Sequence, residues 1–248
     1  MSEFHDQTPA SVPAAAPAPD PAPELRLRSA VIAAALVVVA EIAVSAWGWS
    51  RIPEGALVPI HWGIDGRADG FAPKEVGLLV APAITALLAV LLAVVPRFEP
   101  RRANLARSGR AYRTVIVGIV ALLGILHAAA VLAAVDPTID VARVVATGIG
   151  LLFAVIGNQL GKVRSNFMFG IRTPWTLASD RSWDRTHRLA GRLWVAVGLA
   201  LAALALAGAP GTLLFTALLG GLLLSTAVSV IYSYKTWAED PARRTTSG

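Results

Sequence analysis

The stretch TVIVGIVALLGILHAAAVLAAV, residues 114–135, decides the fold. It carries no Asp, Glu, Lys or Arg, and its one ionisable side chain is His127. A helix rises about 1.5 Å per residue, so this stretch is long enough to cross the roughly 30 Å hydrocarbon core of a bilayer. The sequence therefore predicts a transmembrane helix here.

Five further apolar blocks flank this stretch. They run from Ser29 to Trp49, Val76 to Val95, Val144 to Leu160, Leu193 to Ala207 and Thr212 to Tyr234. The chain as a whole is 55% hydrophobic and only 15% charged, which leaves too little polar surface for a soluble domain of 248 residues. We expect an all-α polytopic membrane protein with six transmembrane helices. The fifth block is short unless Arg192 and Trp194 lie at the interface.

The basic residues predict the orientation of these helices. With the N-terminus inside, 18 of the 22 Lys and Arg residues face the cytoplasm. Only Arg51, Arg67, Lys74 and Arg143 then lie outside. Cytoplasmic loops are rich in Lys and Arg, so both termini are expected to be cytoplasmic. This arrangement explains the net charge of +6 better than direct nucleic-acid binding does.

The blocks and loops divide the chain into four predicted regions. They are a disordered Pro/Ala-rich cytoplasmic tail (1–24), the first two transmembrane helices (25–113) with a structured outer loop (51–75) and a basic inner loop (96–113), a four-helix region (114–236) with an inner motif loop (161–192), and a cytoplasmic tail (237–248). A signal peptide is the alternative for the first helix, because Val44-Ser45-Ala46 resembles a cleavage site. The apolar run of about 20 residues favours a retained helix.

The outer loop contains three Pro and four Gly between Ile52 and Lys74, which predicts a folded, turn-rich segment over the helix ends. His61, Asp65 and Asp69 are spaced four apart and are candidate metal ligands. Alternatively, the two Asp side chains bond turn backbone while His61 and Trp62 lie among the headgroups. No second His is near, so we expect no metal.

The inner motif loop predicts a short helix that begins at Ser179, an N-cap residue followed by Asp180. Trp183, Thr186 and Leu189 share one stripe of it. We expect this helix to lie in the interface, with Trp183 at the acyl boundary and arginines among the headgroups. A simple positive anchor would explain the charge. It does not explain the other conspicuous residues, which are Asn158, Asn166, Thr173, Pro174 and two Trp.

Two ionisable residues fall inside apolar blocks. Glu41 and His127 both lie about 18–20 Å from the inner end of their helices. Buried charge in a membrane costs about 2.5–3.5 kcal/mol on insertion scales, so each needs a partner or water. One hypothesis is that they pair in the outer half. The alternatives are that Glu41 reaches the outer interface or is protonated.

Glycines in the fourth block indicate close helix packing. Gly148, Gly150, Gly157 and Gly161 line it, and Gly157 to Gly161 has the GxxxG spacing that lets backbones approach.

Signatures of soluble enzymes are missing from the sequence. There is no phosphate-binding P-loop, no GxSxG elbow and no HExxH. Ser182, Asp184 and His187 crowd into one helical segment where they cannot converge as a triad. The chain has no Cys, which excludes disulfides and thiolate metal sites. We expect neither catalysis nor a cofactor.

The inner motifs are similar to the signature of the SdpI family. They read Gly157-Asn158, Lys162-x-Arg164-x-Asn166, Gly170-Ile171-Arg172-Thr173-Pro174-Trp175-Thr176-Leu177 and Trp183-x-x-Thr186-His187-Arg188-x-Ala190-Gly191. The outer Pro59-x-His61-Trp62, Asp69-Gly70 and Lys74 resemble a small domain of unknown function often fused ahead of that family. The chain departs from the usual pattern at Gly161 and Ser165 (usually Pro), Gly63 (usually Asn) and Ala68 (usually Pro).

The resemblance implies a multipass protein of the bacterial cytoplasmic membrane that gives immunity to an extracellular peptide toxin. It also implies that the protein holds a cytoplasmic helix-turn-helix repressor at the membrane. The residues expected to bind ligand or partner are Asn158, Lys162, Arg164, Asn166, Gly170, Arg172, Thr173, Pro174, Trp175, Trp183, Thr186, His187 and Arg188 in the inner loop, with Pro59, His61, Trp62, Asp69 and Lys74 in the outer loop. Two other classes stay open. One is a proton-coupled transporter or exporter that uses Glu41 and His127, and the other is a membrane enzyme acting on lipid headgroups.

Overall fold

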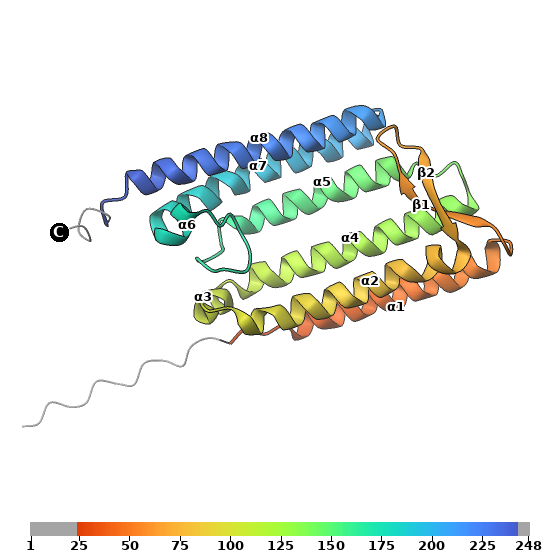
Figure 1. Ribbon diagram of the computed structural model, residues 1–248, viewed down its shortest axis with the longest axis horizontal. Coiled ribbons are helices and arrows are strands. Elements are labelled where there is room, and N and C mark those ends of the chain that lie inside the picture. The colour runs from red at the N-terminus through yellow and green to blue at the C-terminus, as the bar shows by residue number, and fades with distance from the viewer. Residues whose placement is uncertain (1–23, 243–248) are drawn as a thin grey trace, which may run out of the picture.

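The structure, a computed structural model, describes residues 24–242, and its long helices lie side by side in one antiparallel bundle (Figure 1). The described residues form six helices long and apolar enough to cross a membrane, which confirms the predicted fold class. They are α1 (Arg28–Arg51), α2 (Lys74–Val94), α4 (Gly109–Val135), α5 (Val141–Leu160), α7 (Asp180–Leu206) and α8 (Gly211–Ala238). The predicted N-terminal tail, except for Glu24, and residues 243–248 lie outside the described residues.

Shorter elements lie at the two ends of the bundle. Strands β1 (Leu57–Trp62) and β2 (Ala68–Pro73) form an antiparallel hairpin at one end, which we call the hairpin end. The 3-10 helix η1 (Val95–Phe98) and the short helices α3 (Arg102–Arg107) and α6 (Pro174–Ala178) lie at the other, which we call the motif-loop end (Figure 1). Both ends of the described chain lie at the motif-loop end.

The bundle consists of two halves of three long helices each. In the N-half, α1 packs on α2 and α4, and α2 also packs on α4. In the C-half, α7 lies between α5 and α8 and packs on both. The two halves meet along α4 and α5, which are joined by the short segment 136–140. Hydrogen bonds from the side chain and backbone of Thr138 in this segment hold the pKa of Asp136 below its ordinary value.

Glycines bring α5 and α7 into close contact. A Cβ added at Gly150 would lie 2.6 Å from the carbonyl oxygen of Gly198, and one added at Gly157 would lie 2.6 Å from that of Gly191. The two helices therefore meet backbone to backbone at two points seven residues apart. Of the two glycines in the predicted GxxxG pair, one makes a backbone contact between helices. Gly157 makes the contact, but Gly161 lies beyond the helix and faces Arg188.

The short interfacial helix predicted from Ser179 is wrong. Ser179 does cap a helix, since its Oγ accepts a hydrogen bond from the Ser182 amide at 3.0 Å. That helix is α7, however, which continues without a break to Leu206. Trp183 is 1% exposed, and its indole donates to the Val163 carbonyl at 2.7 Å, so it packs inside the protein and not at the acyl boundary.

The outer loop forms the β-hairpin, a specific structure that the turn-rich composition did not identify. Its turn closes through a bond from the Gly63 amide to the Arg67 carbonyl at 2.8 Å, and Gly66 takes a φ of 83°, which favours glycine. Val58 is fully buried against α2, where a Cβ added at Gly77 would lie 2.6 Å from its Cβ. The hairpin is thereby fixed to the N-half.

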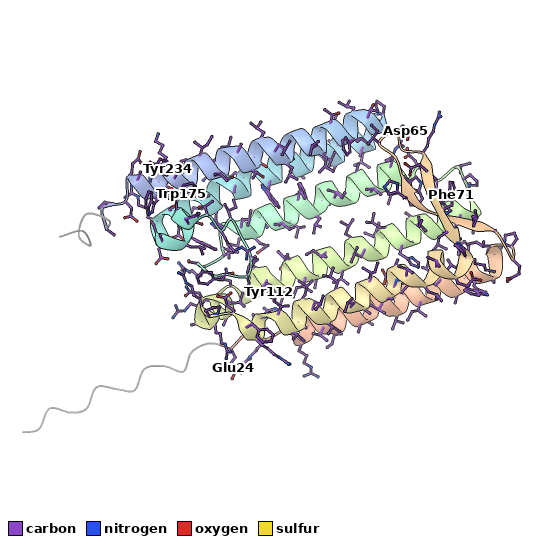
Figure 2. The ribbon with its side chains drawn as sticks, viewed as in Figure 1. Glu24, Asp65, Phe71, Tyr112, Trp175 and Tyr234 are labelled. Atoms are coloured by element: carbon purple, nitrogen blue, oxygen red, sulfur yellow. The ribbon has the colours of Figure 1, made fainter. Side chains whose placement is uncertain are left out.

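The tip of the hairpin reaches across to the C-half. A Cβ added at Gly66 would lie 3.0 Å from the Cβ of Ala142 at the start of α5. A Cβ added at Gly211, the first residue of α8, would lie 2.9 Å from backbone atoms of Ile64 and Asp65. Figure 2 shows Asp65 beside the start of α8, with Phe71 further along the hairpin. The hairpin therefore bridges the two halves.

Candidate functional site

A cavity of about 1020 Å³ lies between the two halves beneath the hairpin. Its walls come from α2, α4, α5, α7 and α8, and the hairpin covers one end. Most of the lining is aliphatic, for example Val80, Ile84, Leu126, Ile149 and Leu214. A space of this size and character suits the apolar part of a ligand.

The hairpin contributes the polar rim of this cavity. His61 Nδ1 lies 2.5 Å from Asp69 Oδ1, and both side chains are exposed. Asp65 Oδ1 accepts a hydrogen bond from the Arg67 amide at 3.1 Å and so stabilises the turn. Because Asp69 pairs with His61 while Asp65 bonds the turn, the candidate metal ligands do not converge. Within residues 24–242, no three His, Cys, Asp or Glu side chains gather as a metal site.

Four of the five predicted outer-loop residues line the cavity, namely Pro59, His61, Trp62 and Asp69. Lys74 does not. It is 4% exposed, its Nζ donates to Glu54 at 3.1 Å, and it lies 5.0 Å from the ring centre of Trp49. Its position at the first turn of α2 indicates that these contacts fix the start of that helix.

The deep end of the cavity carries two polar side chains, Thr85 and His127. Thr85 lies about 16 Å along α2 from its start, close to the middle of the span. Its hydroxyl donates to Glu41 Oε1 at 2.9 Å. Glu41 itself is 2% exposed, and its Oε2 has no hydrogen-bond partner within residues 24–242.

His127 bonds a serine of α1. Its Nε2 lies 2.9 Å from Ser45 Oγ, and that hydroxyl donates to the Leu78 carbonyl at 2.6 Å. A serine hydroxyl has one hydrogen to give, so Nε2 is the donor toward Ser45. Each of the two ionisable side chains therefore bonds a neighbouring hydroxyl, and no ion pair joins their side chains in the described part of the chain.

The motif loop, at the opposite end, is organised around His187. The Ile171 amide donates to its Nε2 at 2.9 Å, so the ring proton is on Nδ1, which donates to the Trp183 carbonyl at 2.8 Å. The ring stacks on Trp183 with 4.0 Å between centroids. Gly170 has a φ of 115°, and a Cβ there would overlap His187 Nε2. Glycine is therefore required beside this histidine.

Other predicted motif residues also hold the loop together. Asn166 is fully buried, and its Oδ1 accepts from the amides of Met168 and Phe169 at 2.8 and 2.9 Å. Thr173 caps α6 in a reciprocal capping box with Thr176, and Pro174 is the first residue of that helix. Trp175 packs edge-on against Tyr234 of α8 at 5.2 Å, and Figure 2 shows the two side by side.

The segment between α2 and α4 bonds the motif loop and so ties the two halves together at this end. Glu99 is 1% exposed and accepts from the Phe167 amide at 3.1 and 3.2 Å. Arg101 donates to the Leu177 carbonyl at 3.2 Å and to Ser165, and it lies over the Phe167 ring at 4.7 Å. We call all the hydrogen bonds and ring contacts between the α2–α4 segment and the motif loop the inner clamp.

Sequence reasoning missed the residues of the inner clamp on the α2–α4 side. They are Glu99, Arg101, Asn104 and Ser108. The Asn104 side chain donates to the Ser165 carbonyl at 2.9 Å. The Ser108 hydroxyl accepts from the Arg164 amide at 2.9 Å. The loop was recognised only as basic. Glu99 is the one acidic residue among the arginines of the loop 96–113, and this was the feature of the sequence that could have predicted a buried carboxylate.

The solvent-facing surface of the motif loop is basic. Its exposed members are Lys162, Arg164, Arg172, Arg185 and Arg188, together with Asn158. Arg172 donates to the Phe167 carbonyl at 2.5 Å and so has one fixed contact. Asp180 and Asp184 line a smaller cavity of about 320 Å³ together with Arg107 and Arg164. Thr186, by contrast, is fully buried, and its Oγ1 has no hydrogen-bond partner among the described residues.

The matches to known protein families fall separately on the two halves of the bundle. Residues 162–233, in the C-half, match the SdpI/YfhL protein family, and residues 36–86, in the N-half, match a domain of unknown function, DUF1648. The chain is 23% identical over 177 residues to "Immunity protein SdpI" of Bacillus subtilis (strain 168), which covers 71% of this chain and 82% of the relative. No solved structure matches. These matches confirm the resemblance that the motifs predicted.

Proposed function

We propose that this multipass membrane protein is an immunity protein of the bacterial cytoplasmic membrane and protects its cell against an extracellular antimicrobial peptide toxin. The observation that carries the proposal is the apolar cavity beneath the hairpin, which is large enough for several side chains of a peptide. Its hairpin rim contains four residues that the motif resemblance singled out. The similarity to a protein named for immunity supports the same function.

In this proposal the hairpin end faces outward and the motif-loop end faces the cytoplasm. The basic residues of the motif loop and of the α2–α4 segment support this orientation, since cytoplasmic loops are enriched in Lys and Arg. The toxin then arrives at the side of the membrane where the hairpin and the cavity lie. Binding captures the toxin before it disrupts the bilayer, and no covalent chemistry is required.

The proposal extends to signalling through the motif loop. A ligand between the halves changes their relative position only to the extent that it binds one arrangement more tightly than another. The inner clamp joins the α2–α4 segment of the N-half to the motif loop of the C-half. A change in the relative position of the halves therefore reaches the exposed Arg172, Arg185 and Arg188. These cations provide a surface for an acidic patch on a cytoplasmic helix-turn-helix repressor.

The immunity proposal is tested by survival of a sensitive bacterial host challenged with peptide toxins, with and without this gene. A matched pair of variants on α4 locates the effect. Ala130 lines the cavity, whereas Ala133 lies on the same helix outside it. Ala130→Phe is expected to reduce protection at unchanged protein abundance in the membrane, while Ala133→Phe keeps it. Absence of protection by the wild-type protein against the toxins of its own genomic neighbourhood contradicts the proposal.

The signalling part has a separate test. Arg172→Ala is expected to reduce co-purification of the repressor with membranes while protection is retained. If protection and recruitment fall together, the motif loop serves immunity itself and not a separate signal.

A proton-coupled transporter is the second candidate, and the observation in its favour is the buried Glu41 with its unbonded Oε2. Ionisable residues inside spans commonly mark proton pathways. The test is flux of the toxin or another substrate in proteoliposomes under a pH gradient. A gradient-dependent flux that Glu41→Gln abolishes favours transport. Full protection by Glu41→Gln favours immunity by binding.

A further inference from the structure

Part of the cavity lining that the long helices carry is exposed. Four of the lining residues on these helices are about half exposed, namely Val76 (43%), Val80 (45%), Ile84 (53%) and Phe215 (46%). The first three follow one face of α2, and Phe215 lies on α8 of the other half. α2 packs on α1 and α4, whereas α8 packs on α7, so these exposed side chains border a gap between α2 and α8. Hydrocarbon, not water, surrounds this part of the molecule.

The end of the cavity that faces the aqueous side is covered. The hairpin runs over it from the N-half, and its tip contacts the start of α5 at Ala142 and the start of α8 at Gly211. Backbone atoms of the tip lie so close to Gly211 that a single added Cβ would be 2.9 Å from them. A ligand therefore finds the open approach from the lipid and not from the water.

Among the charged residues of the cavity lining the carboxylates predominate, and His61, paired with Asp69, is the one rim group that can carry a positive charge. Asp65 and Asp69 are its only carboxylates, and within residues 24–242 no Lys or Arg lines it. At the deep end, Thr85 and His127 are already bonded to Glu41 and Ser45. The deep end thus offers apolar contacts, while the rim offers negative charge.

We propose that the cavity receives the apolar segment of a cationic amphipathic peptide, which enters sideways from the outer leaflet between α2 and α8. The cationic groups of the peptide, ammonium or guanidinium, then meet Asp65 and Asp69 at the rim. This inference rests on the proposed function for the class of ligand and adds its charge and its route. A phospholipid is a poorer occupant, because its phosphate would lie against the same two carboxylates.

The charge of the ligand is tested on full-length protein in nanodiscs of zwitterionic phosphatidylcholine. The probes are a synthetic helical peptide of Leu and Lys and a peptide of the same length in which Glu replaces Lys. The double variant Asp65→Asn, Asp69→Asn keeps an acceptor oxygen for Arg67 and His61 but removes both charges. The control, Glu75→Gln with Asp136→Asn, removes two charges at the same end from residues outside the cavity.

We expect the Leu/Lys peptide to bind the wild-type protein and the control equally. It should bind the double variant roughly three- to tenfold more weakly, because two exposed ion pairs together contribute about that factor to affinity. The Leu/Glu peptide is expected to bind more weakly than the Leu/Lys peptide. Equal binding of both peptides, or equal loss in the control, overturns the charge assignment. Binding of phosphatidylglycerol in preference to the Leu/Lys peptide also overturns it and assigns the cavity to lipid.

The route is tested by narrowing the gap. Ile84→Trp and Val80→Trp add bulk at the gap, while Leu87→Trp adds the same bulk to α2 outside the cavity. We expect the first two to slow binding of membrane-inserted Leu/Lys peptide at least fivefold, and Leu87→Trp to leave it unchanged. Because the chain has no Cys, Phe215→Cys carries a single fluorophore. Its quenching by brominated lipid is expected to fall when the peptide binds.

Unchanged rates in both narrowing variants, with unchanged quenching at position 215, overturn sideways entry. The quenching measurement is independent of the narrowing variants and decides the case if these fail to fold. Failure of the wider proposal is distinct from these outcomes. A protein that binds the Leu/Lys peptide in nanodiscs but gives no survival in cells keeps the inferred site and loses the immunity function.

Discussion

At the scale of single residues, the motif loop depends on His187 and on the glycine beside it. Gly170 has a φ that other residues rarely adopt, and His187 Nε2 occupies the space of a Cβ. The histidine uses both ring nitrogens for backbone bonds, which fixes its tautomer. The motif histidine therefore works as a structural connector between the loop and α7.

Replacing Gly170 by Ala should destabilise the protein by about 1–3 kcal/mol from backbone strain, with a further 1–3 kcal/mol if the Ile171–His187 bond is lost. The measurement is thermal unfolding in detergent. Gly55→Ala is the control, because Gly55 also has a positive φ but has no atom within 4 Å of an added Cβ. A Tm loss in Gly55→Ala as large as that in Gly170→Ala contradicts a role for the His187 contact.

The motif resemblance identified His187, Asn166 and Gly170, yet it predicted partner binding for side chains that mainly bond their own loop. Sequence alone does not show which amide a histidine accepts from, since Ile171 and His187 are separated by sixteen positions along the chain. Exposure separates the two roles. Arg172 and Arg188 face solvent, whereas Asn166 and Thr186 are fully buried.

At the scale of elements, the α5–α7 contact is the closest helix packing in the described bundle. Gly150 and Gly157 on one helix meet Gly198 and Gly191 on the other. Small residues of this kind let transmembrane helices gain van der Waals contacts along their backbones. The C-half is thus built around this pair.

Gly157→Val should push α5 and α7 apart and cost about 1–3 kcal/mol, the range for overpacking a tight contact. Fluorescence-detected size exclusion after heating is the measurement, and a lower Tm is expected. Gly220→Val is the matched control, because an added Cβ at Gly220 has no neighbour within 4 Å. Equal Tm values for the two variants contradict the importance of the glycine contact.

Most long helices could be predicted because hydrocarbon selects apolar blocks of spanning length. The start of α7 could not. The segment from Asp180 to Arg192 contains several arginines, so its pattern resembles a helix lying on the membrane. In the structure its apolar stripe, with Trp183, packs against Val163 and Leu177 of the motif loop. Tertiary contacts, and not the bilayer, cover that stripe.

At the scale of the whole molecule, the two halves touch differently at their two ends. The inner clamp fixes them at the motif-loop end through a buried carboxylate and an arginine. At the hairpin end they are separated by the cavity and connected by the hairpin tip and by the short segment 136–140. Relative motion of the halves is therefore expected at the hairpin end first.

Glu99→Ala should loosen the inner clamp, because it leaves the Phe167 and Arg101 amides without their acceptor. A loss of about 1.4 kcal/mol in this local contact makes opening about tenfold more frequent. Limited trypsin digestion at Lys162, Arg164 and Arg172 should then be roughly tenfold faster. Arg102→Ala, at an exposed neighbouring position, should leave the rate unchanged. Equal rates for the wild type and Glu99→Ala contradict the clamp.

The division into halves has a consequence for chain continuity. Residues 136–140 form the covalent joint between α4 and α5, and most of this joint is exposed. A break there would remove neither a helix nor any member of the inner clamp. Two polypeptides made separately, each inserting three spans, thus retain every surface needed to recognise one another in the lipid.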